Sequence, residues 1–438
     1  MAVPFVCLVM IELQFERGTI DTRLIDYQKA DKGGIDLKIL QVNANYGFGS
    51  TGLIVKDIGE AITESGNEAY FAYQRTNSSV KNGMVIGNPL DWKMHAMLCR
   101  IFGGQGYYSK MATRRFLCDI QRIKPDVVHL HNLHSNYLNI DILFRFLAMK
   151  NIATVITMHD CWYFTGKCFH YVDCGCEGYL HQCGNCPKKK APPKSFFFDR
   201  SISSLQNKKE RLLHIPRLRV VGCSNWICQE AEKGILADCN IETVYNGVDT
   251  SVFMPTDSVI RQEHKIGNDF LVMGMANKWL QPGNVDMLTK VSSLVGVRLM
   301  IVGCTEQQIK KIADIDKNVV AIGFIQEREE LAKYYSVADV FVNLTHADTL
   351  PTVNMESICC GTPVITYNSC GSPELIDEAT GIIVEENDKD GIMKALKYVR
   401  NHNYPDCRQI GIERFDKLSC YNRYIKIYKE LADELSKD

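Results

Sequence analysis

Short apolar runs alternate with amphipathic segments along most of the chain, and this alternation predicts its secondary structure. Buried strands are expected at residues 37–43, 66–73, 125–130, 153–158 and 219–223, and again at 270–274, 297–302, 319–324 and 340–344. Apolar residues recur at helical spacing in other segments, as at 53–65, 331–338 and 418–435. Strands that alternate with helices are typical of parallel sheets with helices on both faces. We therefore expect an α/β protein with doubly wound sheets.

Length and charge narrow the class of protein further. A chain of 438 residues is long enough for two or three domains with sizeable cores. Its net charge of −1 provides no broad basic field for nucleic acid. No apolar stretch reaches the roughly 18–20 residues of a membrane helix. Residues 1–36 are expected to be an extension, because 31–35 is a Gly-containing linker and the apolar run at 3–11 lacks the basic start and cleavage site of a signal peptide.

Two acids eight positions apart mark the candidate site. Asp348 follows the apolar strand at 340–344, and Glu356 lies within about the first two turns of the next helix. The amides of Thr352 and Val353 are then near the N-terminus of that helix, where free N–H groups and the helix dipole favour an anion. Carboxylates on both sides of an anion site suit a ligand with hydroxyl groups at both ends and phosphate in the middle. A nucleotide-sugar has that layout.

This stretch resembles the acid-x7-acid signature of retaining glycosyltransferases of family 4, which have the GT-B fold. The resemblance continues through Gly-Ser-Pro-Glu at 371–374 and Gly-Ile-Ile-Val at 381–384, and it covers most of the chain from Leu37 onward. The first acid is usually Glu in the family and is Asp348 here. Its Asp-x-Leu-Pro form is similar to a subgroup of capsule, O-antigen and colanic-acid type transferases.

The resemblance implies two Rossmann-like domains facing across a cleft. The run from Asn246 to Pro255 is similar to the interdomain segment of the family. The N-terminal, acceptor-side domain is then expected at 37–245, completed by a returning C-terminal helix at about 418–438. The C-terminal domain, which binds the nucleotide-sugar, is expected at 246–417.

The resemblance also implies roles for individual residues. Asp348 would act on the transferred sugar and Glu356 would bind the ribose, while His159, directly after the strand at 153–158, would contact the sugar or the acceptor. The residues expected to bind the donor are Gly49, Ser50, Thr51, Gly52, Asn277, Lys278, Phe324, Leu350, Pro351, Thr352, Val353 and Glu356. Alternatively, the Gly-rich turn at 47–52 is only a tight strand-to-helix connection, and His159 is a structural histidine.

Two further polar residues follow a buried strand and are weaker candidates. His131 and Asn132 come after the strand at 125–130, at a carboxyl end where open α/β sheets bind ligands.

The main departure from the family concerns the basic residues that hold the donor diphosphate in the family. In this chain Met275 and Pro282 occupy their places, and the only cation nearby is Lys278. Either Lys278 and helix amides carry the diphosphate, or donor binding is weakened. No catalytic metal is expected if these groups offset the charge of the leaving group.

A cysteine cluster lies between residues 161 and 186. Cys183 and Cys186 have the C-x2-C spacing that lets two thiolates share one tetrahedral metal ion. The expected ligands of a structural zinc are Cys168, Cys176, Cys183 and Cys186, with Cys174 or His170 as substitutes. The alternative is a set of reduced cysteines or a redox pair.

Basic residues beside aromatic ones come next. Lysines at 188–190 and 194 precede three phenylalanines at 196–198. This combination suits an anionic membrane surface, where each Lys contributes about 1 kcal/mol. The alternative is a solvated loop that leads into a half-buried segment.

These observations predict a cytoplasmic glycosyltransferase, with possible contact to the inner face of the plasma membrane. It would move a sugar from a nucleoside-diphosphate-sugar to a hydroxyl of a glycan or lipid-linked glycan in surface polysaccharide biosynthesis, with retention at the anomeric carbon. One alternative is a GT-B nucleotide-sugar epimerase, which would need no acceptor. The other is a non-catalytic carbohydrate-binding relic, which the missing basic residues permit.

Overall fold

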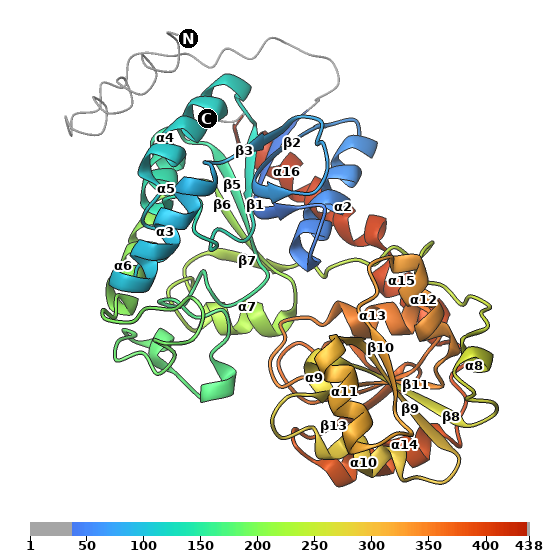
Figure 1. The fold of residues 1–438 in the computed structure, drawn as a ribbon. Coiled ribbons are helices and arrows are strands. Elements are labelled where there is room, and N and C mark those ends of the chain that lie inside the picture. The colour runs from blue at the N-terminus through green and yellow to red at the C-terminus, as the bar shows by residue number, and fades with distance from the viewer. Residues whose placement is uncertain (1–36, 436–438) are drawn as a thin grey trace. The chain divides into compact units, whose positions relative to one another are not determined.

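The computed structural model describes residues 37–435, so the predicted extension at 1–36 lies outside the described residues. The chain forms two compact units. The first contains the described residues up to Gly222, Cys228–Val244 and the chain from Tyr421 onward, and the second contains Cys223–Ile227 and Tyr245–Cys420. Each unit has its own sheet, and Figure 1 colours the chain from one end to the other.

The first unit is built on a seven-stranded sheet. Its strands are β1 (Lys38–Tyr46), β2 (Glu68–Thr76), β3 (Gly83–Val85), β4 (Val127–Leu130), β5 (Ala153–Met158), β6 (Leu218–Gly222) and β7 (Asn240–Thr243). Its helices are α2 (Ser50–Glu64), α3 (Pro89–Phe102), α4 (Lys110–Ile123), α5 (Ile140–Met149), α6 (Ser201–Leu213), and most of α7 (Asn225–Glu232) and α16 (Lys417–Leu435), with 3-10 turns at Val172–Cys174 and Gly178–Leu180. Figure 1 shows α3 to α6 along one side of this sheet and α2 and α16 along the other.

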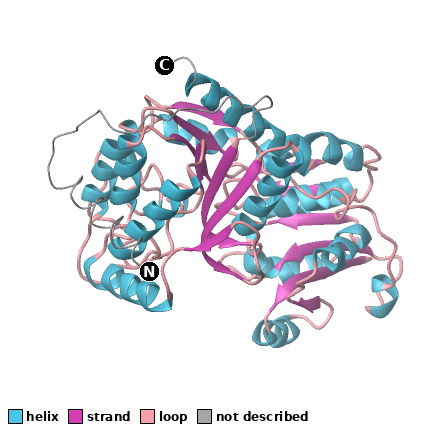
Figure 2. Cartoon of the chain, turned by 90° about the horizontal axis from the view of Figure 1, so that it is seen from above, coloured by secondary structure: helices cyan, strands magenta, loops and turns pink. Residues whose placement is uncertain are grey.

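The second unit is built on a six-stranded sheet. Its strands are β8 (Phe270–Met275), β9 (Val297–Cys304), β10 (Val320–Gly323), β11 (Val340–Asn343), β12 (Val364–Tyr367) and β13 (Gly381–Val384). Its helices are α8 (Ile260–Glu263), α9 (Ala276–Trp279), α10 (Asp286–Ser292), α11 (Glu306–Ile315), α12 (Arg328–Val337), α13 (Thr352–Cys359), α14 (Lys389–Val399) and α15 (Cys407–Phe415), with a 3-10 turn at Pro373–Leu375. Figure 2 shows helices flanking the strands.

Strand order shows where each sheet can bind a ligand. The orders are β3-β2-β1-β4-β5-β6-β7 and β10-β9-β8-β11-β12-β13, and neighbouring strands pair in parallel. The winding direction reverses between β1 and β4 in the first sheet and between β8 and β11 in the second. Open α/β sheets bind ligands outside the carboxyl ends of strands at such a switch point. The predicted α/β class with two doubly wound sheets is confirmed.

Helix α2 begins earlier than the sequence pattern suggested. We expected it from residue 53, but it starts at Ser50, so the expected Gly-rich turn becomes the first turn of the helix. The chain turns into it at Gly49, whose φ of 66° lies in the left-handed region that glycine adopts without strain. A side chain at Gly52 would place its Cβ 3.2 Å from the carbonyl oxygen of Asn45, so glycine here lets the helix approach β1 closely.

Candidate functional site

The switch point of the second sheet brings together a lysine and an acid. Asp348 lies in the loop after β11, and Lys278 lies on α9 directly after the neighbouring strand β8. The Lys278 Nζ is 3.7 Å from Asp348 Oδ2, and these side chains are 18% and 31% exposed. The same Nζ donates a hydrogen bond to Thr345 Oγ1 at 2.8 Å. The cation predicted to replace the missing basic residues therefore lies beside the first acid.

Lys278 is held in this place by buried neighbours. The indole of Trp279 donates to the carbonyl of Val342 on β11 at 2.9 Å. Gly274 leaves room for that ring, because an added Cβ would lie 2.0 Å from Trp279 Nε1. The buried amide of Asn284 donates to the carbonyl of Lys278 at 3.0 Å. These contacts fix the backbone from which the lysine extends.

The second acid, Glu356, lies on α13 and has a tyrosine partner. The hydroxyl of Tyr335, which is fully buried on α12, donates to Glu356 Oε2 at 3.1 Å. Burial raises the pKa of Glu356, and the charge of Arg328 and this hydrogen bond partly oppose the effect. One carboxylate oxygen is thus oriented by the protein. The sequence pattern gave no indication of Tyr335.

Helix α13 directs its N-terminus into the loop that contains Asp348. Pro351 is the N-cap residue, and Thr352 and Val353 form the first turn. In the described chain no side chain caps this turn, and it contains no acidic residue. Backbone N–H groups and the helix dipole therefore favour an anion here. Leu350, by contrast, is buried and can contribute only its backbone or its shape.

The Gly-Ser-Pro-Glu segment at 371–374 supports the acid loop. The amide of Gly371 donates to the carbonyl of Asp348 at 3.2 Å, and an added Cβ would lie only 1.8 Å from the carbonyl oxygen of Thr349. Glu374 accepts hydrogen bonds from the amides of Asn225 and Trp226, at 2.8 and 2.6 Å, at the start of α7. This motif is structural, since its glycine admits the loop and its acid caps a helix.

Two other predicted donor-binding residues of the second unit are exposed. Asn277 is exposed on α9. Phe324 follows β10 and is 83% exposed, an unusual position for a phenylalanine.

The switch point of the first sheet is lined by neutral polar groups. His131 follows β4 and His159 follows β5, and their Nδ1 and Nε2 atoms are 3.1 Å apart. Asn132 reaches towards the first turn of α2, where its Nδ2 is 3.5 Å from Thr51 Oγ1. Its backbone amide donates to Asn43 Oδ1 at 3.1 Å. The predicted residues 51, 131, 132 and 159 therefore lie close to one another.

A row of buried polar side chains continues from these histidines. His129 lies within 2.7 Å of both Tyr428 on α16 and Thr157 on β5. The Thr157 hydroxyl is 2.9 Å from that of Tyr424. Burial lowers the pKa of each histidine in the row, that of His159 to about 4. These imidazoles are therefore neutral near pH 7. This row was not predicted from the sequence, although His129 interrupts an otherwise apolar strand.

Asp160, next to His159, forms a separate, partly buried contact with another histidine. Its Oδ2 is 2.8 Å from His134 Nε2, and its Oδ1 accepts from the amide of Trp162 at 2.9 Å. Burial pushes the pKa of Asp160 upward, but His134 and the other hydrogen bonds outweigh this and lower it. The pair fixes the loop that leaves β5.

The four cysteines predicted to hold zinc do not form a metal site in the described residues. Within residues 37–435, no group of three or more His, Cys, Asp or Glu side chains could hold a metal ion. None of the described cysteines forms a disulfide. Of the four predicted ligands, Cys168 and Cys186 share a hydrogen bond, which lowers the pKa of Cys186 to about 6. Cys176 and Cys183 do not complete a metal site with them.

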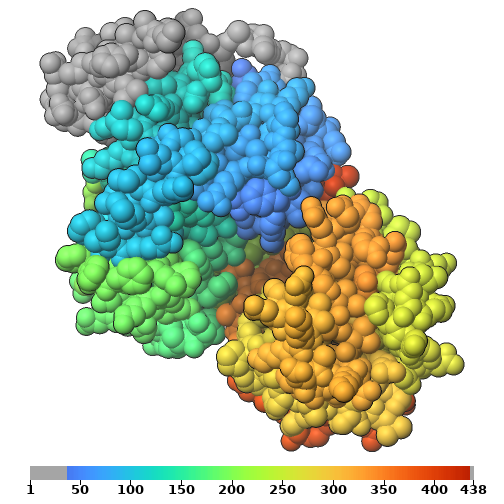
Figure 3. All heavy atoms as spheres, viewed as in Figure 1, coloured from blue at the N-terminus to red at the C-terminus, as the bar shows by residue number. Residues whose placement is uncertain are grey.

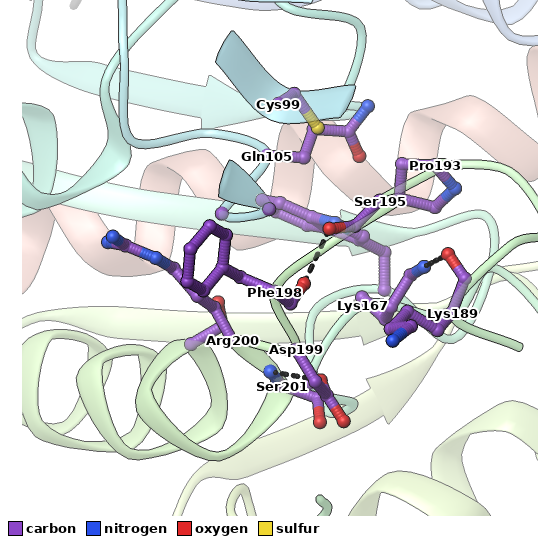
Figure 4. Close-up of a pocket in the computed structure, with 15 residues that line it drawn as sticks. Cys99, Gln105, Lys167, Lys189, Pro193, Ser195, Phe198, Asp199, Arg200 and Ser201 are labelled. Atoms are coloured by element: carbon purple, nitrogen blue, oxygen red, sulfur yellow. Dashed lines mark hydrogen bonds between the residues drawn. The ribbon is translucent and has the colours of Figure 1, made fainter. Parts of the chain in front are cut away.

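Lysines satisfy carbonyl groups of this loop. Lys167 donates to the carbonyl of Lys188 at 3.0 Å and to that of Lys189 at 2.9 Å. Figure 4 shows the second of these hydrogen bonds. Lys188 pairs with Asp173 at 2.7 Å. The C-x2-C spacing indicated only that two thiols could approach each other, and it could not show that charged side chains would satisfy the loop carbonyls.

The described part of the chain has no helix that is both long and apolar enough to cross a membrane.

Each of the two units is Rossmann-like, with a parallel sheet and polar groups at its switch point. Comparison with known protein families agrees with this architecture. The model of glycosyltransferase family 4 matches residues 55–252, and the model of glycosyl transferases group 1 matches residues 269–402. The chain belongs to this family of glycosyltransferases. The predicted family is confirmed.

A curated relative agrees with this assignment. The chain is 25% identical over 289 residues to the putative colanic acid biosynthesis glycosyl transferase WcaC of Escherichia coli (strain K12), and the match covers 60% of this chain and 65% of that protein. The chain thus spans less than two thirds of the length of this curated relative.

Solved structures show the same fold. Sucrose-phosphate synthase (tll1590) from Thermosynechococcus elongatus matches with a TM-score of 0.64 at 15% identity, over 90% of this chain and 99% of that one. Anabaena Alr3699/HepE in complex with UDP matches with a TM-score of 0.58 at 14% identity, over 92% and 100%. At these identities the likeness establishes the GT-B fold alone.

Proposed function

We propose that the protein transfers a sugar from a nucleoside-diphosphate-sugar to a hydroxyl of a glycan or lipid-linked glycan, with retention at the anomeric carbon. The observation that carries the proposal is the meeting of Lys278, Asp348 and the N-terminus of α13 at one switch point, with Glu356 on the same helix. This arrangement suits an anionic group with hydroxyls on either side. The name of the relative in colanic acid biosynthesis supports a role in surface polysaccharide synthesis.

Each residue has a proposed part in donor binding. Glu356, with one oxygen held by Tyr335, would accept hydrogen bonds from the ribose. Asp348 would accept from hydroxyls of the donor sugar. Lys278 and the first-turn amides of α13 would stabilise the diphosphate, and the exposed ring of Phe324 would border the base. At the other switch point, Gly49, the first turn of α2 and His159 would bind hydroxyls of the sugar or the acceptor.

The proposed reaction exchanges one bond at the anomeric carbon. The bond from that carbon to the diphosphate oxygen breaks, and a bond to the acceptor oxygen forms on the same face. The acceptor proton passes to the leaving phosphate. Negative charge develops on the diphosphate, so preorganised cations and dipoles beside it lower the barrier. Lys278 and the α13 amides would supply this stabilisation, and the proposal assigns no catalytic metal.

A donor panel tests the proposal. Purified protein is mixed with UDP-, GDP- and ADP-sugars, and its melting temperature is followed to find the donor. That donor is then incubated with and without glycan or lipid-linked glycan acceptors. We expect sugar transfer that depends on acceptor. A new nucleotide-sugar formed without acceptor would indicate the epimerase, and binding without turnover of any donor would indicate the non-catalytic relic.

The position of the product bond and its anomeric configuration complete the test. Retention is checked by nuclear magnetic resonance of the product formed from a donor of known configuration. An inverted product would overturn that part of the proposal, while transfer itself would stand.

Contact with the inner face of the plasma membrane is a further part of the proposal. Helix α3 exposes Leu90, Met94, Met97 and Phe102, which are 39–69% exposed, and Phe196 to Phe198 are 48–69% exposed. The rings of Phe102 and Phe198 stack with centroids 5.8 Å apart, so the two groups form one surface, here called the apolar-basic face. In Figure 3 the light-blue surface borders the green one on this unit.

Positive charge borders the apolar-basic face. Lys93 and Arg100 are exposed on α3, and Lys190, Lys194 and Arg200 are exposed around the phenylalanines. Of the nearby acids, Asp91 caps α3 and Asp199 accepts hydrogen bonds from backbone amides. Apolar side chains amid Lys and Arg are typical of surfaces that bind anionic lipid. We therefore commit to an anionic bilayer as the occupant of this face.

The aromatic segment is fixed in place. The amide of Phe196 donates to the carbonyl of Arg100 at 2.7 Å, and Ser195 Oγ donates to the carbonyl of Phe198 at 2.5 Å. Figure 4 shows Ser195, Phe198 and Arg200 around the small pocket beneath this segment. A fixed loop presents its rings without the entropy cost of ordering them on binding.

Vesicle co-sedimentation tests the apolar-basic face. We expect binding to vesicles with anionic lipid, weak binding to phosphatidylcholine vesicles, and loss of binding when Phe196 and Phe197 are both replaced by Ser. Val295→Ser is a matched control, because Val295 is 92% exposed on the second unit. Equal binding by the double variant would overturn this assignment. A change of oligomeric state in the double variant, without a change in lipid binding, would instead indicate a second copy as the occupant.

A further inference from the structure

We propose that Gln41 and His131 are positioning residues that fix which nitrogen of His159 carries the proton. Gln41 lies in the middle of β1, and its side chain leads through His131 to His159. All three belong to the first unit and lie at or near its switch point. The proposal rests on the proposed function only where it assumes that His159 meets the ligand.

The amide of Gln41 determines which atoms donate and which accept in this series of hydrogen bonds. Its Nε2 donates to the carbonyl of Val55 on α2 at 3.1 Å. The other end of the amide, Oε1, is 3.1 Å from Nε2 of His131. An amide oxygen can only accept, so Nε2 of His131 must carry a proton. The reversed amide would place two acceptor oxygens, those of Gln41 and Val55, against each other.

The position of the proton on His131 determines its position on His159. Burial keeps His131 neutral, since its pKa is well below the usual value, so its Nδ1 carries a lone pair. That Nδ1 faces Nε2 of His159 at 3.1 Å, and Nε2 of His159 must therefore donate. His159 is itself neutral near pH 7, because burial lowers its pKa to about 4. Its Nδ1 is consequently a hydrogen-bond acceptor, so a ligand group that reaches it must donate, as a sugar hydroxyl does.

Neighbouring contacts hold the rings of this chain in place. The imidazoles of His131 and His159 stack with centroids 5.4 Å apart, and those of His129 and His131 lie 4.0 Å apart. His131 is fully buried, and so is Gln41. Water therefore cannot replace the hydrogen bond from His131 to Gln41. Removing the acceptor at residue 41 should reverse the tautomers along the chain.

Nitrogen-15 spectroscopy of the full-length protein tests this directly. In the wild type we expect the proton on Nε2 and the lone pair on Nδ1, for both His131 and His159. In Gln41→Met the Nε2–H of His131 loses its acceptor, so we expect the proton of each histidine on Nδ1 instead. Signals are assigned with a His159→Gln variant.

Controls separate this effect from a general loss of structure. In Gln41→Glu, burial favours the protonated carboxyl, whose O–H can donate to the carbonyl of Val55 as the amide does while the other oxygen accepts from His131, so this variant should keep the wild-type tautomers. Thr154→Val removes another buried polar group, which donates to the carbonyl of Ile152 at 3.0 Å away from the histidines, and should also keep them. Protonated Nδ1 of His159 in the wild type, or unchanged tautomers in folded Gln41→Met, would overturn the proposal.

Kinetics then tests the link to function separately. We expect Gln41→Met to lower kcat/KM of sugar transfer by about 10-fold, the effect of one lost hydrogen bond, and Thr154→Val to leave it unchanged. Reversed tautomers with unchanged kcat/KM would show that His159 does not meet the ligand through Nδ1, and would overturn that half alone. Absence of any transfer in the wild type would count against the proposed function and leave the tautomer result intact.

Discussion

Replacing Lys278 by Met tests the assignment of the cation that binds the donor diphosphate. The variant keeps the length of the side chain and removes its charge. In the free protein the ammonium of Lys278 is 3.7 Å from Asp348 and 2.8 Å from the hydroxyl of Thr345, so it already lies among the groups assigned to the donor. Its side chain is only 18% exposed, and salt therefore screens it incompletely.

The size of the effect follows from these contacts. A hydrogen bond to a charged group contributes about 1.5–3 kcal/mol. At about 1.4 kcal/mol for each factor of ten, the Kd for the nucleoside diphosphate should rise about 10- to 150-fold. Removing the cation also leaves Asp348 uncompensated next to the phosphates, which shifts the expectation to the upper part of this range. In the double variant with Asp348→Asn, part of the loss should therefore be recovered.

Isothermal titration calorimetry with the nucleoside diphosphate and with the nucleoside measures this effect. Lys278→Met should weaken binding of the diphosphate and leave binding of the nucleoside unchanged. Lys389→Met is the matched control, because Lys389 pairs with Asp286 at 2.6 Å near the edge strand β13 and is 27% exposed. An unchanged Kd for the diphosphate in folded Lys278→Met would refute the assignment. An equal loss for nucleoside and diphosphate would refute it as well, since Lys278 would then act elsewhere.

Three other predictions concern groups at the two switch points. Glu356→Gln should mainly raise the donor KM, whereas Asp348→Asn should lower kcat by about 10²–10³-fold, since Asp348 is proposed to act beside the reacting carbon. Equal kcat losses in steady-state kinetics would contradict separate roles. Tyr335→Phe should raise the donor KM by about 2- to 10-fold and leave kcat unchanged, and an unaltered KM would show that the hydroxyl does not orient Glu356. Stability should fall as pH drops from about 6.5 towards 4, because the pKa of His159 is lowered to about 4 and the unfolded chain binds more protons in that window; urea unfolding of His159→Gln should show a weaker pH dependence, and an identical slope would contradict this cause.

Residues at the ends of strands were predictable from the sequence. Lys278, Asp348, His131 and His159 each follow an apolar run of the sequence, and parallel strands bring their carboxyl ends to one edge of a sheet. The structure accordingly places Lys278 beside Asp348 and His131 beside His159. The position of each residue after a strand was sufficient to predict these contacts, because the parallel topology brings the ends of the strands together.

Supporting partners were not predictable in this way. Tyr335 donates to Glu356 across 21 positions, and its role depends on how α12 packs against α13. Gln41 reaches His131 across 90 positions. The predicted zinc site is not formed in the described residues for a related reason. The cysteine spacing describes what two neighbouring thiols can do, but contacts of the loop are made by residues distant in sequence, such as Glu230 with Tyr171 and Tyr179.

The two switch points differ in charge, and this difference bears on which ligand groups each unit would bind. The second sheet presents a lysine and two carboxylates, Lys278, Asp348 and Glu356, together with helix amides. In the proposed function, that lysine and those amides would stabilise a doubly charged diphosphate, and the carboxylates would accept hydrogen bonds from hydroxyls on either side. The first sheet presents histidines that burial keeps neutral, among them His131 and His159. Neutral acceptors bind hydroxyls without attracting phosphate. If the proposed function holds, the second unit would discriminate by charge and select the nucleotide part of the donor. The first unit would discriminate by the pattern of hydroxyl groups and select the sugar or the acceptor.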